Sequence, residues 1–234
     1  MNILAFDTTT NACSAAVLSE GKILAEKSIK IRIGHAEKLI PMIIEVIENA
    51  NLTFKEISGI GVTRGPGSFA GVRIGLATAR AVALASNKPL LGVVSLKVIA
   101  AGLKKDQVEN KIIVPVMDAR KGQCYVAIYK SNLNTILEPF AMDFGKTAKI
   151  IASTRKDTNI IVAGSGSNQL SIELEKYGVI AEVPLGDHLP RASVLARVTC
   201  EIVQREGWPK TVVSPLYLRD SGASPPSGIF LKNA

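Results

Sequence analysis

The chain has few of the side chains on which most catalytic and metal sites depend. Its 234 residues include two histidines, His35 and His188, from which any catalytic triad or histidine metal site would have to be built. The three cysteines, Cys13, Cys124 and Cys200, are far apart and form no CxxC pair. This is typical of small apolar residues in a reduced compartment. We therefore expect neither a metal site nor a triad.

Long apolar runs and aromatic side chains are also scarce. No apolar run approaches the roughly 20 residues that a membrane helix needs. The N-terminus, Met1 to Asp7, has no basic region and carries an aspartate where a signal peptide would continue apolar. We expect a cytoplasmic protein without membrane contact. Aromatic residues make up 5% of the chain, which disfavours direct recognition of RNA bases by stacking.

The composition is that of a globular protein with a basic surface. Apolar residues account for 47% and charged residues for 21%, and the formal net charge is +8. The basic residues are scattered, with no run longer than a pair such as Lys104–Lys105. Charge alone is therefore weak support for nucleic-acid binding.

Apolar periodicity and turn residues divide the chain into two halves. The first half reads as three strands, a helix, a strand, a helix, a strand and a short helix, over residues 2–6, 13–18, 22–29, 35–50, 57–62, 69–85, 89–94 and 95–103. A polar segment, "KKDQVEN", follows and suits a boundary. Strands are predicted next at 112–117, 123–129 and 159–163, with polar helix candidates between the last two and a late helix at 191–204. We predict domains at 1–103 and 104–220 and a flexible tail, rich in Pro, Ser and Gly, at 221–234.

The helix at 35–50 has a wide apolar face. Leu39, Met42, Ile43, Val46 and Ile47 line one side. Ile40 and Ile44 widen that side beyond what one core contact needs, which favours contact of part of it with another surface.

The stretch "TRGPGSFAGVRIGLATARAVA" has glycines that fit no phosphate-binding template. The glycines of "GPGSFAG" give GxGxxxG, one residue too long for a dinucleotide fingerprint, and the Walker lysine is absent. Small residues instead recur at every fourth position: Gly71, Gly75, Ala79 and Ala83. Glycine inside a helix costs about 1 kcal/mol relative to alanine, so a close neighbour is expected. The pattern leaves open whether that neighbour is the protein's own sheet or a helix of another protein.

Several segments together resemble one family. "ILAFDTTTNACSAAVL", "HAEKLIPMI", "RGPGSFAGVRIGLATARAVA", "GVVSL", "MDARKGQCYVAIY" and "PLYLRD" are similar, in order and spacing, to the TsaB (YeaZ) family. The resemblance covers nearly the whole chain to Asp220. It implies an actin-like (ASKHA, ribonuclease H-like) α/β fold of two related domains with mixed sheets and flanking helices.

The resemblance also implies a role without catalysis. TsaB proteins are the dimerisation subunit of the bacterial machinery for tRNA threonylcarbamoyladenosine. They pair with the catalytic subunit TsaD, the nucleotide-hydrolysing subunit TsaE joins the pair, and the complex transfers a threonylcarbamoyl group to the adenosine beside the anticodon. We expect tRNA contact only through that complex, and a homodimer when the chain is isolated.

The family pairing implies an interface on the helices at 35–50 and 69–85. The stripe of small residues would then face a partner helix. The interface residues expected on these helices are His35, Leu39, Met42, Ile43, Val46, Phe69, Val72, Arg73, Gly75, Leu76, Ala79 and Arg80.

The resemblance further implies that the catalytic and nucleotide sites are eroded. Ser95 and Ile99 stand where the catalytic relative has two metal-binding histidines, and isoleucine cannot bind a metal. Thr9 replaces the glycine of the D-x-G-T nucleotide loop. A vestigial nucleotide site would comprise Asp7, Thr9, Thr10, Gly164 and Gly166. No cofactor is expected, although weak nucleotide binding stays open.

Two other functions stay open at this point. Relatives of the fold have been labelled glycoproteases, but proteolysis needs an activated nucleophile or a metal-bound water, and the chain has no HExxH motif. An autonomous RNA-binding module would need clustered basic and aromatic residues, which the sequence lacks.

Overall fold

The computed structural model describes residues 1–155, 159–186 and 188–219. The predicted flexible tail at 221–234 lies outside the described residues. The strands are β1 (Asn2–Thr10), β2 (Ala12–Ser19), β3 (Lys22–Lys30), β4 (Gly59–Thr63), β5 (Leu90–Val93), β6 (Ile112–Arg120), β7 (Gln123–Lys130), β8 (Thr135–Asp143), β9 (Ile160–Ala163) and β10 (Ala181–Glu182). The helices are α1 (His35–Asn49), α2 (Phe69–Ser86), α3 (Ser95–Ala101), α4 (Lys105–Val108), α5 (Phe144–Arg155), α6 (Ser167–Glu175) and α7 (Ala192–Glu206).

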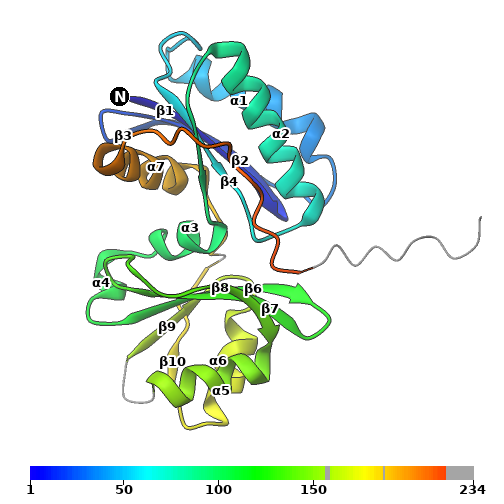
Figure 1. Ribbon diagram of the computed structural model, residues 1–234, viewed down its shortest axis with the longest axis vertical. Coiled ribbons are helices and arrows are strands. Elements are labelled where there is room, and N and C mark those ends of the chain that lie inside the picture. The colour runs from blue at the N-terminus through cyan, green and yellow to red at the C-terminus, as the bar shows by residue number, and fades with distance from the viewer. Residues whose placement is uncertain (156–158, 187, 220–234) are drawn as a thin grey trace, which may run out of the picture.

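Two five-stranded mixed sheets have the same topology. The first has the order β3-β2-β1-β4-β5, and the second, read from its other edge, has the matching order β8-β7-β6-β9-β10. In each sheet the first three strands form an antiparallel meander, and the last two are parallel to the central strand. The parallel strands are joined through helices, as parallel connections require. Figure 1 shows the two sheets as separate halves of the molecule.

The sequence missed strand β8. The segment "TILEPFAMD" falls where only polar helix candidates were predicted, yet it pairs antiparallel with β7 along the edge of the second sheet. Pro139 and Glu138 argue against a central strand, but an edge strand tolerates both because one side needs no hydrogen bonds. With β8 included, the second sheet has the same number and arrangement of strands as the first.

Helices α3 and α7 cross between the halves, which corrects the predicted domain limits. Helix α3 follows the first sheet in the chain but packs on β6 and β7, and Leu96 and Ile99 join the core beside the second sheet. Helix α7 follows the second sheet but packs on β1 and β2 of the first. The segment after α7 also returns to the first sheet, where Trp208 and Val213 lie beside Gly59 and Gly92. Residues 104–220 therefore do not form one continuous domain.

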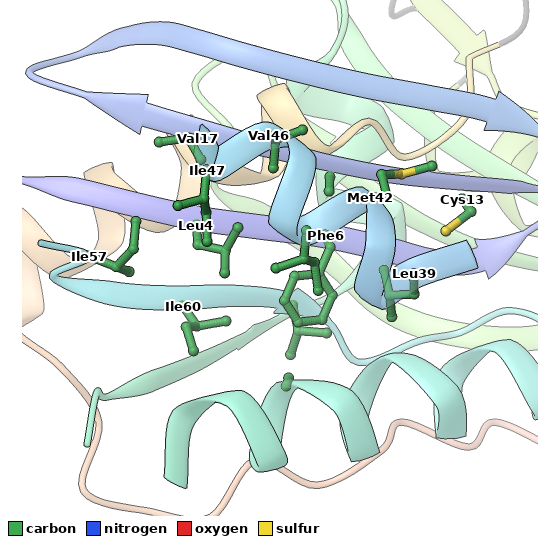
Figure 2. Close-up of a cluster of buried hydrophobic side chains, with 14 of the residues drawn as sticks. Leu4, Phe6, Cys13, Val17, Leu39, Met42, Val46, Ile47, Ile57 and Ile60 are labelled. Carbon is green, nitrogen blue, oxygen red and sulfur yellow. The ribbon is translucent and has the colours of Figure 1, made fainter. Parts of the chain in front are cut away.

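The central strand of the first sheet is covered on both faces. Leu4 and Phe6 point to a core shared with α1 and α2, whereas Ile3 and Ala5 point to a core shared with α7. Successive side chains of a strand alternate between faces, so burial of both explains the continuous apolar run in β1. Figure 2 shows Leu4 and Phe6 of β1 beneath α1.

Helix α2 approaches the first sheet more closely than ordinary side chains would allow. Ser68 caps its N-terminus by accepting a hydrogen bond from the backbone N–H of Gly71. A Cβ atom at Gly71 would overlap the carbonyl oxygen of Thr8, and one at Gly75 would lie 2.7 Å from Thr8 Oγ1. The Thr8 hydroxyl uses this proximity to donate a 2.6 Å hydrogen bond to the Gly71 carbonyl. The small residues therefore face the protein's own β1, and the alternative of a partner helix against that stripe is wrong.

Helix α2 is an exception to the expectation that no segment is long and apolar enough to span a membrane. Its 18 residues have a mean hydropathy of 1.3, which by length and composition alone is enough to cross a membrane. The core helix of a globular protein passes the same test, and the inner side of α2 packs on β1 and β4. The apolar residues on the inner side of α2 are thus accounted for by their place on the sheet.

Replacing Gly75 with leucine should disrupt the fold itself. The added side chain has no room beside Thr8 and Val62, so we expect the free energy of unfolding in urea to fall by at least about 2 kcal/mol. Ala77→Leu places the same side chain on the exposed side of the helix and serves as the control. Equal stability of the two variants would contradict the packing of α2 described here.

Candidate functional site

Asp7 lies at the centre of a buried polar cluster near the end of β1. Its Oδ1 accepts hydrogen bonds from the hydroxyls of Thr63, at 2.5 Å, and Thr9, at 2.6 Å, and from the Thr9 backbone N–H. Its Oδ2 is buried without a hydrogen-bond partner among the described residues. The hydroxyl of Ser95, at the start of α3, donates a hydrogen bond to the Thr9 hydroxyl oxygen at 3.3 Å. The cluster therefore joins β1, β4 and α3 where the two halves meet.

Burial has the largest effect on the pKa of Asp7. Desolvation raises the pKa of the carboxyl from 3.8 to about 6, against the hydrogen bonds from Thr63 and Thr9, which lower it. Because the pKa is higher in the folded state, the folded protein binds this proton more tightly. The resulting stabilisation is complete below about pH 4 and is lost as the pH rises through about 6.

This behaviour can be measured with the isosteric variant Asp7→Asn, which does not titrate. The difference between the two pKa values corresponds to about 3 kcal/mol. We expect the unfolding free energy of the wild type, minus that of Asp7→Asn, to fall by about this amount between about pH 4 and pH 8. Urea unfolding across that range gives the difference directly. A constant difference would show that Asp7 titrates like a solvated carboxyl.

The expected nucleotide residues divide between a cleft and the interior. A cleft of about 590 Å³ opens between the halves, and Thr9 and Thr10 line it. Asp7 is fully buried and does not. A Cβ at Gly164 would overlap the carbonyl oxygen of Val116, and Gly166 lies against Phe144. Internal packing therefore requires glycine at 164 and leaves little room for a side chain at 166, and neither glycine is among the residues that line the cleft.

Thr9 fills the place of the expected loop glycine, and the loop before α2 closes on it. A Cβ at Gly67 would overlap the Thr9 carbonyl oxygen, and the backbone N–H of Ser68 donates to that oxygen at 2.7 Å. The strand end and the glycine loop are thus bonded to each other. This contact is made by the Thr9 backbone, whereas the Thr9 hydroxyl donates to Asp7.

The sequence did not reveal the cationic side of the cleft. Arg120 and Lys121, in the turn between β6 and β7, line it together with Arg219. Arg219 Nη1 donates to the Ala119 carbonyl at 2.6 Å, which ties the end of the described chain to the second half. These basic residues lie in the segments "MDARKGQCYVAIY" and "PLYLRD". Because the two segments are 100 residues apart, no local sequence pattern predicts that they lie side by side.

Each of the two histidines lies within hydrogen-bond distance of a backbone carbonyl oxygen. His35 Nε2 lies 3.0 Å from the Thr10 carbonyl, and His188 Nε2 lies 3.2 Å from the Pro184 carbonyl. Within residues 1–155, 159–186 and 188–219, no group of three or more His, Cys, Asp or Glu side chains is placed to hold a metal ion. Ile99, which was expected to stand in place of a metal-binding histidine, is buried in an apolar cluster.

The structure also corrects most of the expected interface residues. The residues of that set that lie buried within the chain itself are His35, Leu39, Met42, Ile43, Val46, Val72, Gly75, Leu76 and Ala79. They belong to the inner sides of α1 and α2, and Figure 2 shows Leu39, Met42 and Val46 among the core side chains. A partner cannot reach them without opening the core. Phe69, Arg73 and Arg80 are exposed.

Both helices nevertheless keep an apolar outer side. Helices α1 and α2 contact each other on the same side of the first sheet. Their exposed apolar residues are Ala36, Ile40, Pro41, Ile44, Phe69, Ala70, Ala77, Ala81, Leu84 and Ala85. Six of these are called here the outer face: Ile40, Ile44, Ala70, Ala77, Ala81 and Leu84. Ile40 and Ile44 are 43% and 41% exposed, and Leu84 is 85% exposed. As expected, Ile40 and Ile44 extend the apolar side of α1 beyond the part that packs in the core.

Comparison with known proteins identifies the family. The sequence model of the family described as TsaD, tRNA N6-adenosine threonylcarbamoyltransferase, matches residues 22–182. The tRNA threonylcarbamoyladenosine biosynthesis protein TsaB of Escherichia coli is 35% identical over 58% of this chain and 58% of its own length. The protein of the same name from Haemophilus influenzae is 27% identical over 94% of both chains. The chain belongs to the TsaD family, in its TsaB (YeaZ) group.

Solved structures agree with this placement. YeaZ from Pseudomonas aeruginosa superposes with a TM-score of 0.78 at 25% identity and covers 93% of this chain and 99% of its own. An activator of 2-hydroxyisocaproyl-CoA dehydratase from Clostridium difficile, at 13% identity, shares the fold alone, with a TM-score of 0.51. The TsaB-group chain thus has the actin-like α/β fold that the sequence motifs implied. The E. coli and Bacillus subtilis relatives are matched over only 58% and 61% of their length.

Proposed function

We propose that this chain is a non-catalytic subunit in the biosynthesis of tRNA threonylcarbamoyladenosine, and that it pairs with a TsaD-type transferase. The names of the relatives support the pathway. The observation that carries the pairing is the outer face of α1 and α2. It leaves apolar side chains in water on two adjacent helices, and such a surface gains free energy when another protein covers it.

The state of the inherited sites supports a role without catalysis. Ser95 and Ile99 offer no pair of metal ligands, and Ile99 is buried among apolar residues. Thr9 and the loop before α2 are hydrogen-bonded to each other. Each histidine is near a backbone carbonyl rather than activating a hydroxyl or thiol, which also argues against a peptidase.

The proposal assigns each component a task. The TsaD-type subunit carries out the transfer of the threonylcarbamoyl group to the adenosine beside the anticodon. This chain covers and stabilises it, TsaE joins the pair, and tRNA binds the assembled complex in the cytoplasm. Without a partner, the outer face of one copy would meet that of another, giving a symmetric homodimer.

Size-exclusion chromatography with light scattering tests the pairing. We expect this chain, mixed with the TsaD of its own organism, to form a one-to-one complex. Ala77→Glu puts a charge in the middle of the outer face and should abolish the complex while leaving the fold intact, since the position is exposed. Ile172→Glu, at a 58% exposed position on α6, is the matched control and should still bind. Failure of the wild type to bind TsaD, or normal binding by Ala77→Glu, would contradict the proposal.

A further inference from the structure

Two arginines lie along one edge of the exposed apolar residues of α2. Arg73 and Arg80 are exposed and lie seven residues apart, so they project from the same side of the helix about 10 Å apart along its axis. Helix α2 contains no acidic residue. Among the ion pairs of the described residues, none involves Arg73 or Arg80. Their positive charges are therefore not balanced within the part of the chain that the structure describes.

The segment after α7 holds both guanidinium groups in place. Arg73 Nε donates to the Tyr217 hydroxyl at 3.1 Å, and its guanidinium carbon lies 3.6 Å from the centre of the Phe69 ring. The Phe69 and Tyr217 rings contact each other, with centroids 5.2 Å apart. Arg80 Nη2 donates to the Val213 carbonyl at 2.6 Å. Each arginine is thus fixed at one edge of α2 by neutral groups.

That segment is itself anchored to the first sheet. The backbone N–H of Leu216 donates to the Arg64 carbonyl at 2.7 Å, and Gly92 leaves room for Val213. Figure 1 shows the segment, in orange, running from α7 to the region between the two halves. The positions of Arg73 and Arg80 are therefore set by the fold rather than by free rotation of long side chains.

Such an arrangement suits recognition of carboxylates. A guanidinium has five N–H donors, and each of these two uses one in the hydrogen bonds described above. The remaining donors can bind a carboxylate in a bidentate manner. Because neither side chain must be ordered on binding, less conformational entropy is lost than for a mobile arginine.

We propose that the outer face of α2 takes a partner helix with apolar residues along its contact line and two carboxylates beside it, about two helical turns apart. The inference rests on the proposed pairing with TsaD and adds the chemistry of the partner surface. A helix fits because Ala70, Ala77 and Ala81 make the face of α2 thin between the arginines and the neighbouring α1. A nucleic-acid backbone would gain nothing from that apolar strip.

Titration calorimetry with TsaD at several salt concentrations tests the partner chemistry. We expect the double variant Arg73→Gln/Arg80→Gln to bind TsaD about tenfold more weakly than the wild type at low salt, and to lose most of the salt dependence of Kd. The control Arg197→Gln/Arg205→Gln removes the same charge from α7, on the opposite side of the sheet, and should bind like the wild type. Tyr217→Phe keeps the ring but removes the acceptor for Arg73, and should weaken binding by a few fold.

The outcomes separate this inference from the proposed function. If the wild type binds TsaD and the double variant binds equally well with the same salt dependence, the carboxylate inference is wrong while the pairing stands. If the double variant binds TsaD normally but the complex loses tRNA, the arginines serve the nucleic acid and the inference is equally overturned. If the wild type does not bind TsaD at all, the proposed function and this inference both fail.

Discussion

The contact between α2 and β1 determines the arrangement of the first half of this protein. Thr8 is the centre of that contact, because its carbonyl oxygen occupies the space of a Gly71 Cβ and its hydroxyl bonds the Gly71 carbonyl. The helix can lie this close only because Gly71 and Gly75 lack side chains. The cost of two glycines in a helix, about 1 kcal/mol each, is offset by the burial of Val72 and Leu76 in the core.

Two consequences follow from this close approach. The glycine loop before α2 is brought onto Thr9, so the strand end and the loop bond to each other at the edge of the cleft. The small residues of α2 that do not face β1, among them Ala77 and Ala81, remain on the outside. The same helix therefore holds the glycine loop against the end of β1 on one side and supplies a thin apolar surface on the other. A fold shared with nucleotide-binding proteins becomes suited, in our account, to binding a partner.

The sequence predicted the elements of the first half because each has a local cause. Turn residues separate the three strands of the meander, and Ser68 marks the start of α2. Strand β8 was missed because Pro139 and Glu138 hide its alternation, and an edge strand needs little of it. The crossing of α3 and α7 was missed because periodicity reveals that a helix has a buried side but not which sheet covers it.

The candidate site was predicted less well, for a similar reason. The helices proposed for the partner interface both have an exposed apolar side, but the residues first chosen lie mainly on the inner sides. A stripe of small residues looks the same whether its neighbour is a strand of the same chain or a foreign helix. The support of Arg73 by Tyr217 joins residues 144 positions apart, which no local pattern reveals.

The central claim is that TsaD covers the outer face of α2, and thiol protection would test it most directly. The three native cysteines are buried, so a single cysteine introduced by Ala77→Cys can be labelled selectively with a maleimide. The account predicts that TsaD slows labelling of this cysteine at least about tenfold, while labelling of an Ile172→Cys control is unchanged. Equal rates at position 77 with and without bound TsaD would contradict it.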